Sequence, residues 1–315
     1  MRLLVTGGAG FIGSHIAEQA VARGWEVAVL DDLSSGNRDN VPVQATFFEG
    51  DIRDEILVRR VFENFRPSVV SHQAAQASVS VSVREPAKDA EINILGSINL
   101  LSAAVEFDVD RFLFASTGGA IYGEVPAGAA TEETPPQPLS PYAASKFAVE
   151  NYLRCFQREH GLKYNILRYA NVYGPRQDPH GEAGVVAIFL NRLLAGEALQ
   201  INAMREAGDP GCIRDYVHVH DVVAANLAAA EGQIPHTVMN VATGVGTTTR
   251  ELAETLFTVL QQRVELRFAG RRMGDTERSV LSPARYAELL QMPLSLAAGL
   301  GNTAEWFCQK ALGSR

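Results

Sequence analysis

Two residues one helical turn apart, Tyr142 and Lys146, carry side chains suited to proton transfer. A spacing of four residues places both side chains on the same face of a helix. An ammonium beside a phenol lowers the pKa of that phenol, which is about 10 in isolation. Such a phenol can exchange a proton with a substrate hydroxyl near neutral pH. The pair therefore predicts acid–base chemistry, although surface helices also carry this spacing by chance.

A glycine-rich turn near the N-terminus predicts a dinucleotide site. An apolar strand over 2–6 is followed by glycines at positions 7, 10 and 13 and by a helix over 16–23. Glycines at these points allow a tight turn, close approach of a pyrophosphate and close packing of helix on strand. The helix N-terminus then faces the phosphates. The residues expected to contact the cofactor here are Gly7, Gly10, Phe11, Ile12 and Gly13.

A carboxylate follows the second predicted strand. The apolar run 26–30 ends at Asp31, about twenty residues after the glycines, where an acid binds a ribose hydroxyl in dinucleotide-binding folds. The same charge would repel a 2′-phosphate, so NAD is expected rather than NADP. The glycine spacing differs from the commonest fingerprint, and a purely structural glycine turn is the alternative.

The elements that position these residues alternate regularly. Strands are predicted over 45–49, 68–72, 111–115 and 164–168, separated by helices that include 54–65, 90–107 and the one that carries Tyr142. This alternation predicts an α/β fold with a doubly wound parallel (Rossmann) sheet, which binds ligands at the carboxyl ends of its strands. At one such end, after the strand over 68–72, lie Gln73, Ala74 and Ala75. Small residues there would let a ligand approach the backbone. The alternative is that they serve close helix packing.

Two regions are expected in the chain. Residues 1–175 form the NAD-binding Rossmann domain, whose helix carries the catalytic tyrosine and lysine. Residues 176–315 form a smaller, mixed α/β and mainly substrate-binding domain at the C-terminus, with some segments returning to the Rossmann sheet.

Composition excludes several classes of function. The net charge of −8 over 315 residues argues against nucleic acid or an anionic membrane as the main partner. No apolar run approaches the ~20 residues of a membrane span, and the chain enters a strand directly after Met1. Three widely spaced cysteines indicate reduced thiols in a cytoplasm. His218 and His220 lack a third ligand nearby, so packing is expected and no metal.

The glycine spacing, the acid and the Tyr-x-x-x-Lys motif together resemble the extended short-chain dehydrogenase/reductase family, from Met1 to about Trp306. Within it, the chain is similar to the branch of UDP-sugar 4-epimerases. The resemblance implies an NAD cofactor and a UDP-sugar substrate. It implies interconversion of UDP-glucose and UDP-galactose through a transient 4-keto sugar, with the N-acetylated pair as a further substrate class. It also implies a homodimer in which helices 90–107 and 143–160 pair with their copies.

The same resemblance assigns further site residues. Additional cofactor contacts would be Asp51, Ile52, Asn93, Tyr169 and Ala170. Substrate contacts would be Asn171, Arg214 and Arg272 for the diphosphate, Asp275 for the uridine ribose and Ser279 beside the sugar 2-substituent. Thr117 would orient the sugar 4-oxygen. Counting back from Tyr122 reaches Gly118 instead, which has no hydroxyl, and Ser116 is the fallback.

The loop after Thr117 bears on the reaction class. Related dehydratases place acidic residues where this chain has Gly118 and Gly119, and elimination of water needs an acid and a base beyond the tyrosine. Hydride exchange at one carbon is therefore favoured over a dehydratase or reductase. A UDP-glucuronate 4-epimerase and a non-catalytic NAD-sensing protein also stay open, and a sensor would often lose Tyr142.

Overall fold

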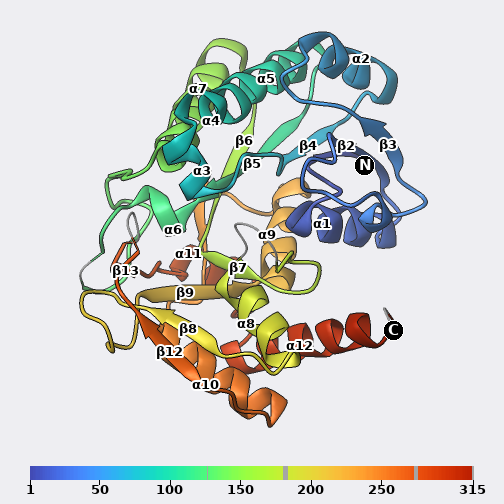
Figure 1. Ribbon diagram of the computed structural model, residues 1–315. Helices are drawn as coiled ribbons and strands as arrows, with labels where there is room; N and C mark the ends of the chain where they lie inside the picture. Colours follow the sequence, from blue (N-terminus) through green and yellow to red (C-terminus); the bar gives the residue numbers. More distant parts are fainter. Residues whose placement is uncertain (126, 180–183, 273–275, 314–315) are drawn as a thin grey trace.

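The computed structural model describes residues 1–125, 127–179, 184–272 and 276–313 (Figure 1). Its centre is a seven-stranded, wholly parallel sheet in the order β10-β6-β5-β4-β1-β2-β3. The strands are β1 (Arg2–Thr6), β2 (Glu26–Asp31), β3 (Thr46–Glu49), β4 (Val69–His72), β5 (Arg111–Thr117), β6 (Tyr164–Tyr169) and β10 (Val238–Val241). This order reverses direction beside β1, which confirms the doubly wound fold.

Helices cover both faces of this sheet (Figure 1). One face carries α1 (Phe11–Ala22) and α9 (Val219–Ala230), and the other carries α2 (Glu55–Phe65), α5 (Gly96–Glu106) and α7 (Pro141–His160). Successive residues of β1 enter the two layers, since Leu3 packs into the α1 side and Leu4 into the α2 side. Strands buried on both faces are continuously apolar, which is why they were predictable from the sequence.

The segment before α5 differs from the single helix predicted over 90–107. It consists of α3 (Val79–Arg84), α4 (Pro86–Ala90) and a π-helical turn, η2 (Glu91–Leu95), that runs directly into α5. The wider turn rotates the side chains that follow it. Leu95, placed on the buried stripe by a constant helical period, is therefore 55% exposed, while Asn93 is buried.

Helix α7 begins and ends at the residues that its sequence indicates. The Ser140 side chain accepts a hydrogen bond from the Ala143 amide, Pro141 occupies the first turn, and Gly161 ends the helix at φ +74°. The apolar pattern of this helix predicts five residues outside the sheet-facing stripe: Phe147, Val149, Tyr152, Leu153 and Phe156. That prediction is wrong for Val149 and Leu153, which are buried against the sheet.

A smaller part lies beside the carboxyl edge of the sheet, and α9 and β10 return from it to the central layers. Its strands are β7 (Asn171–Tyr173), β9 (Ile213–His218), β11 (Gly246–Thr248) and β13 (Arg278–Ser279) in one sheet, and β8 (Leu199–Asn202) with β12 (Leu266–Ala269) in another. Its helices are α8 (Val185–Leu194), α10 (Thr249–Leu260), α11 (Ala284–Leu289) and α12 (Leu296–Gly313). The short segments η1 (Arg38–Asn40) and α6 (Gly118–Ile121) complete the elements of the described residues.

The Thr248–Glu251 spacing predicts a capping box at the start of α10, and this is confirmed, because the Thr248 side chain and the Glu251 backbone and side chain bond reciprocally. The sequence also predicts two short helices at the end of the chain. Two helices are present, but the second, α12, is long, with 18 residues. Glycines within α12 made the helix hard to recognise, because glycine disfavours helices. At Gly299 a Cβ would collide with the Tyr173 hydroxyl, so glycine there allows close packing.

Candidate active site

A cavity of about 910 Å³ opens at the carboxyl edge of the central sheet, where parallel sheets of this type bind ligands. Most residues predicted to bind the cofactor line it: Gly7, Gly10, Phe11, Ile12, Gly13, Asp31, Asp51, Ile52, Gln73, Ala74, Ala75, Tyr142, Lys146 and Tyr169. Asn93 is buried outside the lining, and Ala170 is buried in the core beside it.

The glycine turn at the head of α1 is required sterically. Gly7 has φ +68°, and a Cβ there would lie 2.6 Å from the Ala74 amide nitrogen. A Cβ at Gly13 would collide with the carbonyl oxygen of Gly7. Gly10 is the N-cap residue of α1 and supplies no side-chain cap, so the first N–H groups of the helix are left to face the cavity. The turn thus has the form that a dinucleotide diphosphate needs.

Asp31 lies in the wall of the same cavity. Its carboxylate accepts hydrogen bonds of 2.9 Å from the amides of Ala9 and Leu33. Burial raises the pKa of this carboxyl, and the two backbone amides oppose that rise. An ionised carboxylate has about four acceptor sites, so two remain for ribose hydroxyls. The glycine turn and Asp31 together fit NAD.

The catalytic pair comes from the first turns of α7. The Thr117 side chain interacts with the phenol of Tyr142 and lowers its pKa, and Lys146 Nζ donates to the Ala115 carbonyl oxygen at 3.0 Å. Burial raises the pKa of Tyr142 to about 12, although the Thr117 hydrogen bond lowers it. Burial also lowers the pKa of Lys146 to about 8. The expectation that Lys146 lowers the pKa of Tyr142 is not met by the protein groups: the lowering effect comes from Thr117, and burial outweighs it.

The two hydroxyls at the end of β5 have different partners. Thr117 acts on the Tyr142 phenol and lowers its pKa, whereas Ser116 Oγ donates to Glu150 Oε1 at 2.6 Å. This arrangement favours Thr117 over Ser116 as the group that orients a substrate oxygen. It remains a prediction, since the contact is with the tyrosine and not with a sugar.

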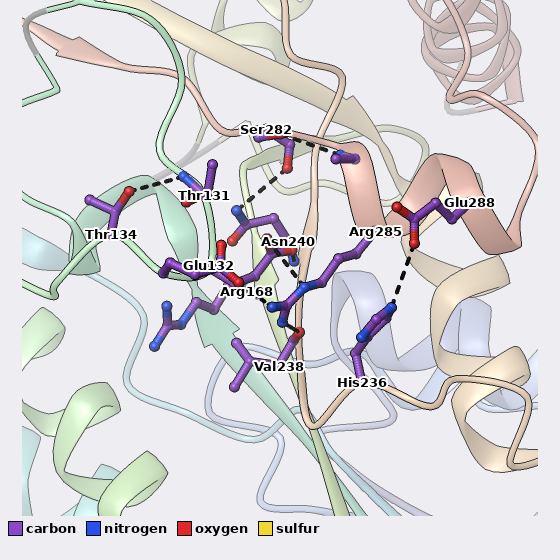
Figure 2. A network of polar contacts seen from close by, with 12 residues as sticks. Thr131, Glu132, Thr134, Arg168, His236, Val238, Asn240, Ser282, Arg285 and Glu288 are labelled. Atoms are coloured by element: carbon purple, nitrogen blue, oxygen red, sulfur yellow. Dashed lines mark hydrogen bonds and ion pairs between the residues drawn. The ribbon is translucent and has the colours of Figure 1, made fainter.

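Behind Ser116 lies a buried polar network that the sequence reasoning missed. Arg168 pairs with Glu150 at 2.6 Å and donates to the Tyr122 hydroxyl at 2.8 Å. Tyr122 in turn donates to Asn240 Oδ1 at 2.8 Å. Figure 2 shows the network continuing from Asn240 to Glu132, whose carboxylate lies 3.7 Å from Arg285 Nε. The network connects α7 to β6, β10 and α11. The sequence signal that could have indicated this network is a charged residue inside an otherwise apolar run, such as Arg168 in β6.

The predicted substrate residues come from strands of the smaller part. Asn171 Nδ2 on β7 donates to the Asp215 carbonyl oxygen at 3.1 Å, and Arg214 lies half-buried on β9. The position of a Cβ on Gly119 would be 3.6 Å from the Asn171 amide, so the Gly118–Gly119 turn and Asn171 are neighbours. Arg272 reaches Ser80 on α3 at 2.8 Å. Asp275 lies outside the described residues.

Ser279 lies beneath the turn that follows Thr117. It is 2% exposed, and its hydroxyl donates to the Gly119 carbonyl oxygen at 3.1 Å. It does not line the cavity described above. Because Ser279 is covered by the turn at Gly119, a sugar 2-substituent beside Ser279 would contact the Gly119 turn as well.

Metal-ligand clusters and membrane-spanning helices were sought in the part of the chain that the structure describes. It holds no group of three histidine, cysteine, aspartate or glutamate residues arranged for a metal ion. Across the same residues, no helix is both long and apolar enough to cross a membrane. His218 packs edge-to-face on Tyr173, and burial lowers its pKa to about 4.

A doubly wound sheet with a glycine turn, an acid after β2 and a Tyr–Lys pair at its carboxyl edge defines an extended short-chain dehydrogenase/reductase. Residues 3–242 match the NAD dependent epimerase/dehydratase family, and the chain belongs to that family. Its cofactor is NAD.

Relatives match over almost the whole chain. The chain is 43% identical to the UDP-glucose 4-epimerase of Mycolicibacterium smegmatis, over 99% of this chain and 100% of the relative. The structure superposes with a TM-score of 0.93 on the UDP-glucose 4-epimerase of Thermus thermophilus in complex with NAD, at 52% identity and 98% and 99% coverage. It superposes with a TM-score of 0.94 on the Thermotoga maritima UDP-glucose 4-epimerase with UDP-glucose, at 48% identity and 99% and 100% coverage.

Proposed function

We propose that the protein is an NAD-dependent UDP-sugar 4-epimerase that interconverts UDP-glucose and UDP-galactose. The observation that carries this proposal is the Tyr142 phenol, one turn from Lys146, in the wall of a cavity whose glycine turn and Asp31 suit a dinucleotide. The overall similarity to UDP-glucose 4-epimerases supports it.

In this mechanism the chain moves one proton and holds the sugar. Tyr142 takes the proton of the 4-hydroxyl when carbon 4 is oxidised and returns it when the ketone is reduced. Thr117, which acts on the phenol of Tyr142, holds the 4-oxygen beside it. Lys146 adds a positive charge that favours the phenolate. Bound NAD supplies the hydride acceptor and donor for carbon 4 and is not consumed.

The turn after Thr117 supports epimerisation over elimination. A Cβ on Gly118 would collide with Leu281 and lie 3.2 Å from the Arg168 carbonyl oxygen. A side chain on Gly119 would instead point toward Asn171. The turn therefore supplies neither acid nor base to the sugar, and Tyr142 is left as the proton-transfer group.

The roles of the two regions and the assembly are part of the proposal. Residues 1–175 bind NAD and carry the catalysis, while 176–315 mainly bind the UDP-sugar, with Asn171, Arg214 and Arg272 on the diphosphate. The enzyme is a cytoplasmic homodimer. Three free thiols fit a reducing compartment, and the exposed apolar side chains of α7 and the π turn favour self-association.

The test is to incubate the purified protein with UDP-glucose and separate the products. UDP-galactose without net NADH is the expected result. The Tyr142→Phe variant should retain NAD and lose turnover by about a thousandfold, because it lacks the proton-transfer group. A 4-keto-6-deoxy sugar would identify a dehydratase, and an NAD-loaded protein that turns over no UDP-sugar would favour a sensor.

A further inference from the structure

Asp89, on α4, is a carboxylate that the proposed mechanism leaves unused. It is 0% exposed. Oδ1 accepts from Gln76 Nε2 at 2.8 Å and from Asn93 Nδ2 at 3.0 Å, and Oδ2 accepts from Ser145 Oγ at 2.6 Å. All three donors are neutral, and no ion pair joins Asp89 to a cation in the described part of the chain. Asp89 accepts three hydrogen bonds and donates none, which is the pattern of an ionised carboxylate.

The position of Asp89 ties it to the catalytic helix. Ser145 lies between Tyr142 and Lys146 on α7, so the 2.6 Å bond fixes α7 beside its reactive turn. The other two donors hold the segment after β4, where the Gln76 amide nitrogen also donates to Asn93 Oδ1 at 2.9 Å. The π-helical turn begins two residues after Asp89, and such turns are frequent at functional sites.

A charge this close acts on both members of the catalytic pair. Asp89 raises the pKa of Tyr142, in addition to the larger effect of burial. It also raises the pKa of Lys146, against the burial that lowers it. A buried negative charge therefore keeps the lysine cationic and delays ionisation of the phenol.

The other charged groups on the surrounding elements do not share this role. Arg84 on α3, Lys88 on α4 and Glu91 on the π turn are exposed, and Lys88 pairs with Glu85 at 3.4 Å. His72 on β4 is fully buried, and burial with the Lys146 charge keeps its pKa well below the usual range, so it stays neutral. On α7 and β6, Glu150 and Arg168 neutralise each other.

We propose that Asp89 is a positioning residue of the epimerase, which docks α7 and sets the charge of the Tyr142–Lys146 pair from behind. The inference rests on the proposed function, because it assigns a role within that site. Removing its charge must lower the pKa of every ionisable neighbour. Both limbs of the activity profile then move to lower pH, whichever residue governs each limb.

The substitution Asp89→Asn tests the charge with little change of shape. The amide oxygen can keep the bonds from Gln76 and Asn93. The amide nitrogen can donate to Ser145, whose hydroxyl rotates to accept. Asp221→Asn is the matched control, since Asp221 is also a buried carboxylate but lies on α9 and bonds the Leu294 amide. Ser145→Ala separates docking from charge: it should lower kcat and leave the limbs in place.

The first measurement is the pH dependence of kcat/KM with UDP-glucose. Asp89→Asn should shift both limbs to lower pH by about one unit, so that activity on the alkaline side falls about tenfold. Asp221→Asn should leave the limbs unchanged. If the wild-type protein turns over no UDP-sugar, the proposed function fails; if it does and the Asp89→Asn limbs coincide with wild type, the role of Asp89 fails.

The second measurement needs no catalysis. Near-ultraviolet absorbance measures phenolate formation as the pH is raised. For each protein, the titration of its Tyr142→Phe version is subtracted, which leaves the signal of Tyr142. The Tyr142 phenolate should form at lower pH in the Asp89→Asn variant than in the protein that keeps Asp89. Equal titrations would overturn the proposal. If Asp89→Asn does not fold by circular dichroism, Asp89→Ser removes the same charge and must show the same shifts.

Discussion

At the scale of single residues, burial governs the catalytic pair. It holds Tyr142 protonated and makes Lys146 less basic, so each side chain is least stable in the charged form that the chemistry uses. The sequence could predict this pair, its spacing and its helix. It could not predict the directions of the pKa changes, because they depend on how the chain folds around the pair and on Asp89 from a different helix.

This cost of burial predicts that Lys146→Met stabilises the protein. A pKa of about 8 in place of 10.5 corresponds to about 3 kcal/mol at neutral pH, because each pKa unit is worth about 1.4 kcal/mol. Between these two values the unfolded chain binds more protons, so the free energy of unfolding of the wild type rises with pH. Part of the gain is lost with the hydrogen bond to Ala115.

Urea unfolding of wild type and Lys146→Met, both freed of nucleotide, measures the effect. We expect the variant to be more stable by about 1–3 kcal/mol at neutral pH. The difference should shrink as the pH rises from about 8 towards 10.5, and turnover should be strongly reduced. A variant less stable than wild type at neutral pH would show that the ammonium carries no burial cost.

A second prediction at this scale concerns substrate range. Serine at 279 and glycine at 119 leave the wall beside Asn171 without a large side chain. We expect the wild type to epimerise both UDP-glucose and UDP-N-acetylglucosamine. A tyrosine ring at 279 could extend only past Gly119 into the space toward Asn171, because closely packed walls do not yield a ring's volume. Ser279→Tyr should selectively remove the N-acetylated activity.

Product separation with both sugars measures this selectivity, and Ser279→Ala is the control that removes only the hydroxyl. If the wild type converts UDP-glucose but leaves UDP-N-acetylglucosamine unchanged, the turn at Gly119 already fills the space.

At the scale of elements, α7 is held by more than its apolar face. Glu150 and Arg168 are 0% and 3% exposed and form a pair between α7 and β6. A paired buried charge stabilises little by itself, but an unpaired one is costly. Glu150→Gln should lower the free energy of unfolding by about 3–5 kcal/mol, because it leaves the Arg168 guanidinium buried without a counter-charge.

Urea unfolding measures this loss, and a surface pair provides its control. Arg59 and Glu106 make an equally close contact between α2 and α5, at 2.7 Å, but both are largely exposed. Glu106→Gln should therefore cost much less than Glu150→Gln, because water already screens the exposed pair. Adding Arg168→Met to Glu150→Gln should recover part of the loss. Similar losses at positions 150 and 106 would contradict the role of burial.

The elements that sequence patterns missed have physical reasons in common. The π turn after α4 changes the helical period for one turn, so a constant period predicts the wrong residues to be buried, of which Leu95 is one. The glycine at 299 in α12 conceals a long helix, because its lack of a side chain admits the Tyr173 hydroxyl. In both the π turn and α12, packing between distant parts of the chain overrides the local sequence pattern.

At the scale of the whole molecule, regular alternation made the sheet predictable and brought the cofactor residues to one edge. The substrate side was harder to predict. Its residues come from β7, β9 and β13, short strands far apart in the sequence, and Arg272 reaches back to Ser80 on α3. Periodicity identifies elements but not how distant short strands meet.

The last prediction concerns assembly. On the side of α7 away from the sheet, Tyr152 is 40% exposed, and Val83 on α3 and Leu95 on the π turn are 60% and 55% exposed. Since α3, the π turn and α7 pack together, these side chains lie on neighbouring elements and suit a two-fold contact with a second copy. We expect a homodimer at micromolar concentration by light scattering.

Tyr152→Glu should shift this protein to monomer, because it would bring two carboxylates into an apolar contact. Met292→Glu is the control, since Met292 is 63% exposed but follows α11 in the smaller part, and it should leave the dimer intact. A wild-type monomer would contradict the homodimer, and a dimer that survives Tyr152→Glu and dissociates with Met292→Glu would place the contact elsewhere. Because Tyr152 lies on the helix that carries Tyr142, dissociation should also reduce turnover if pairing of the two copies keeps α7 in position.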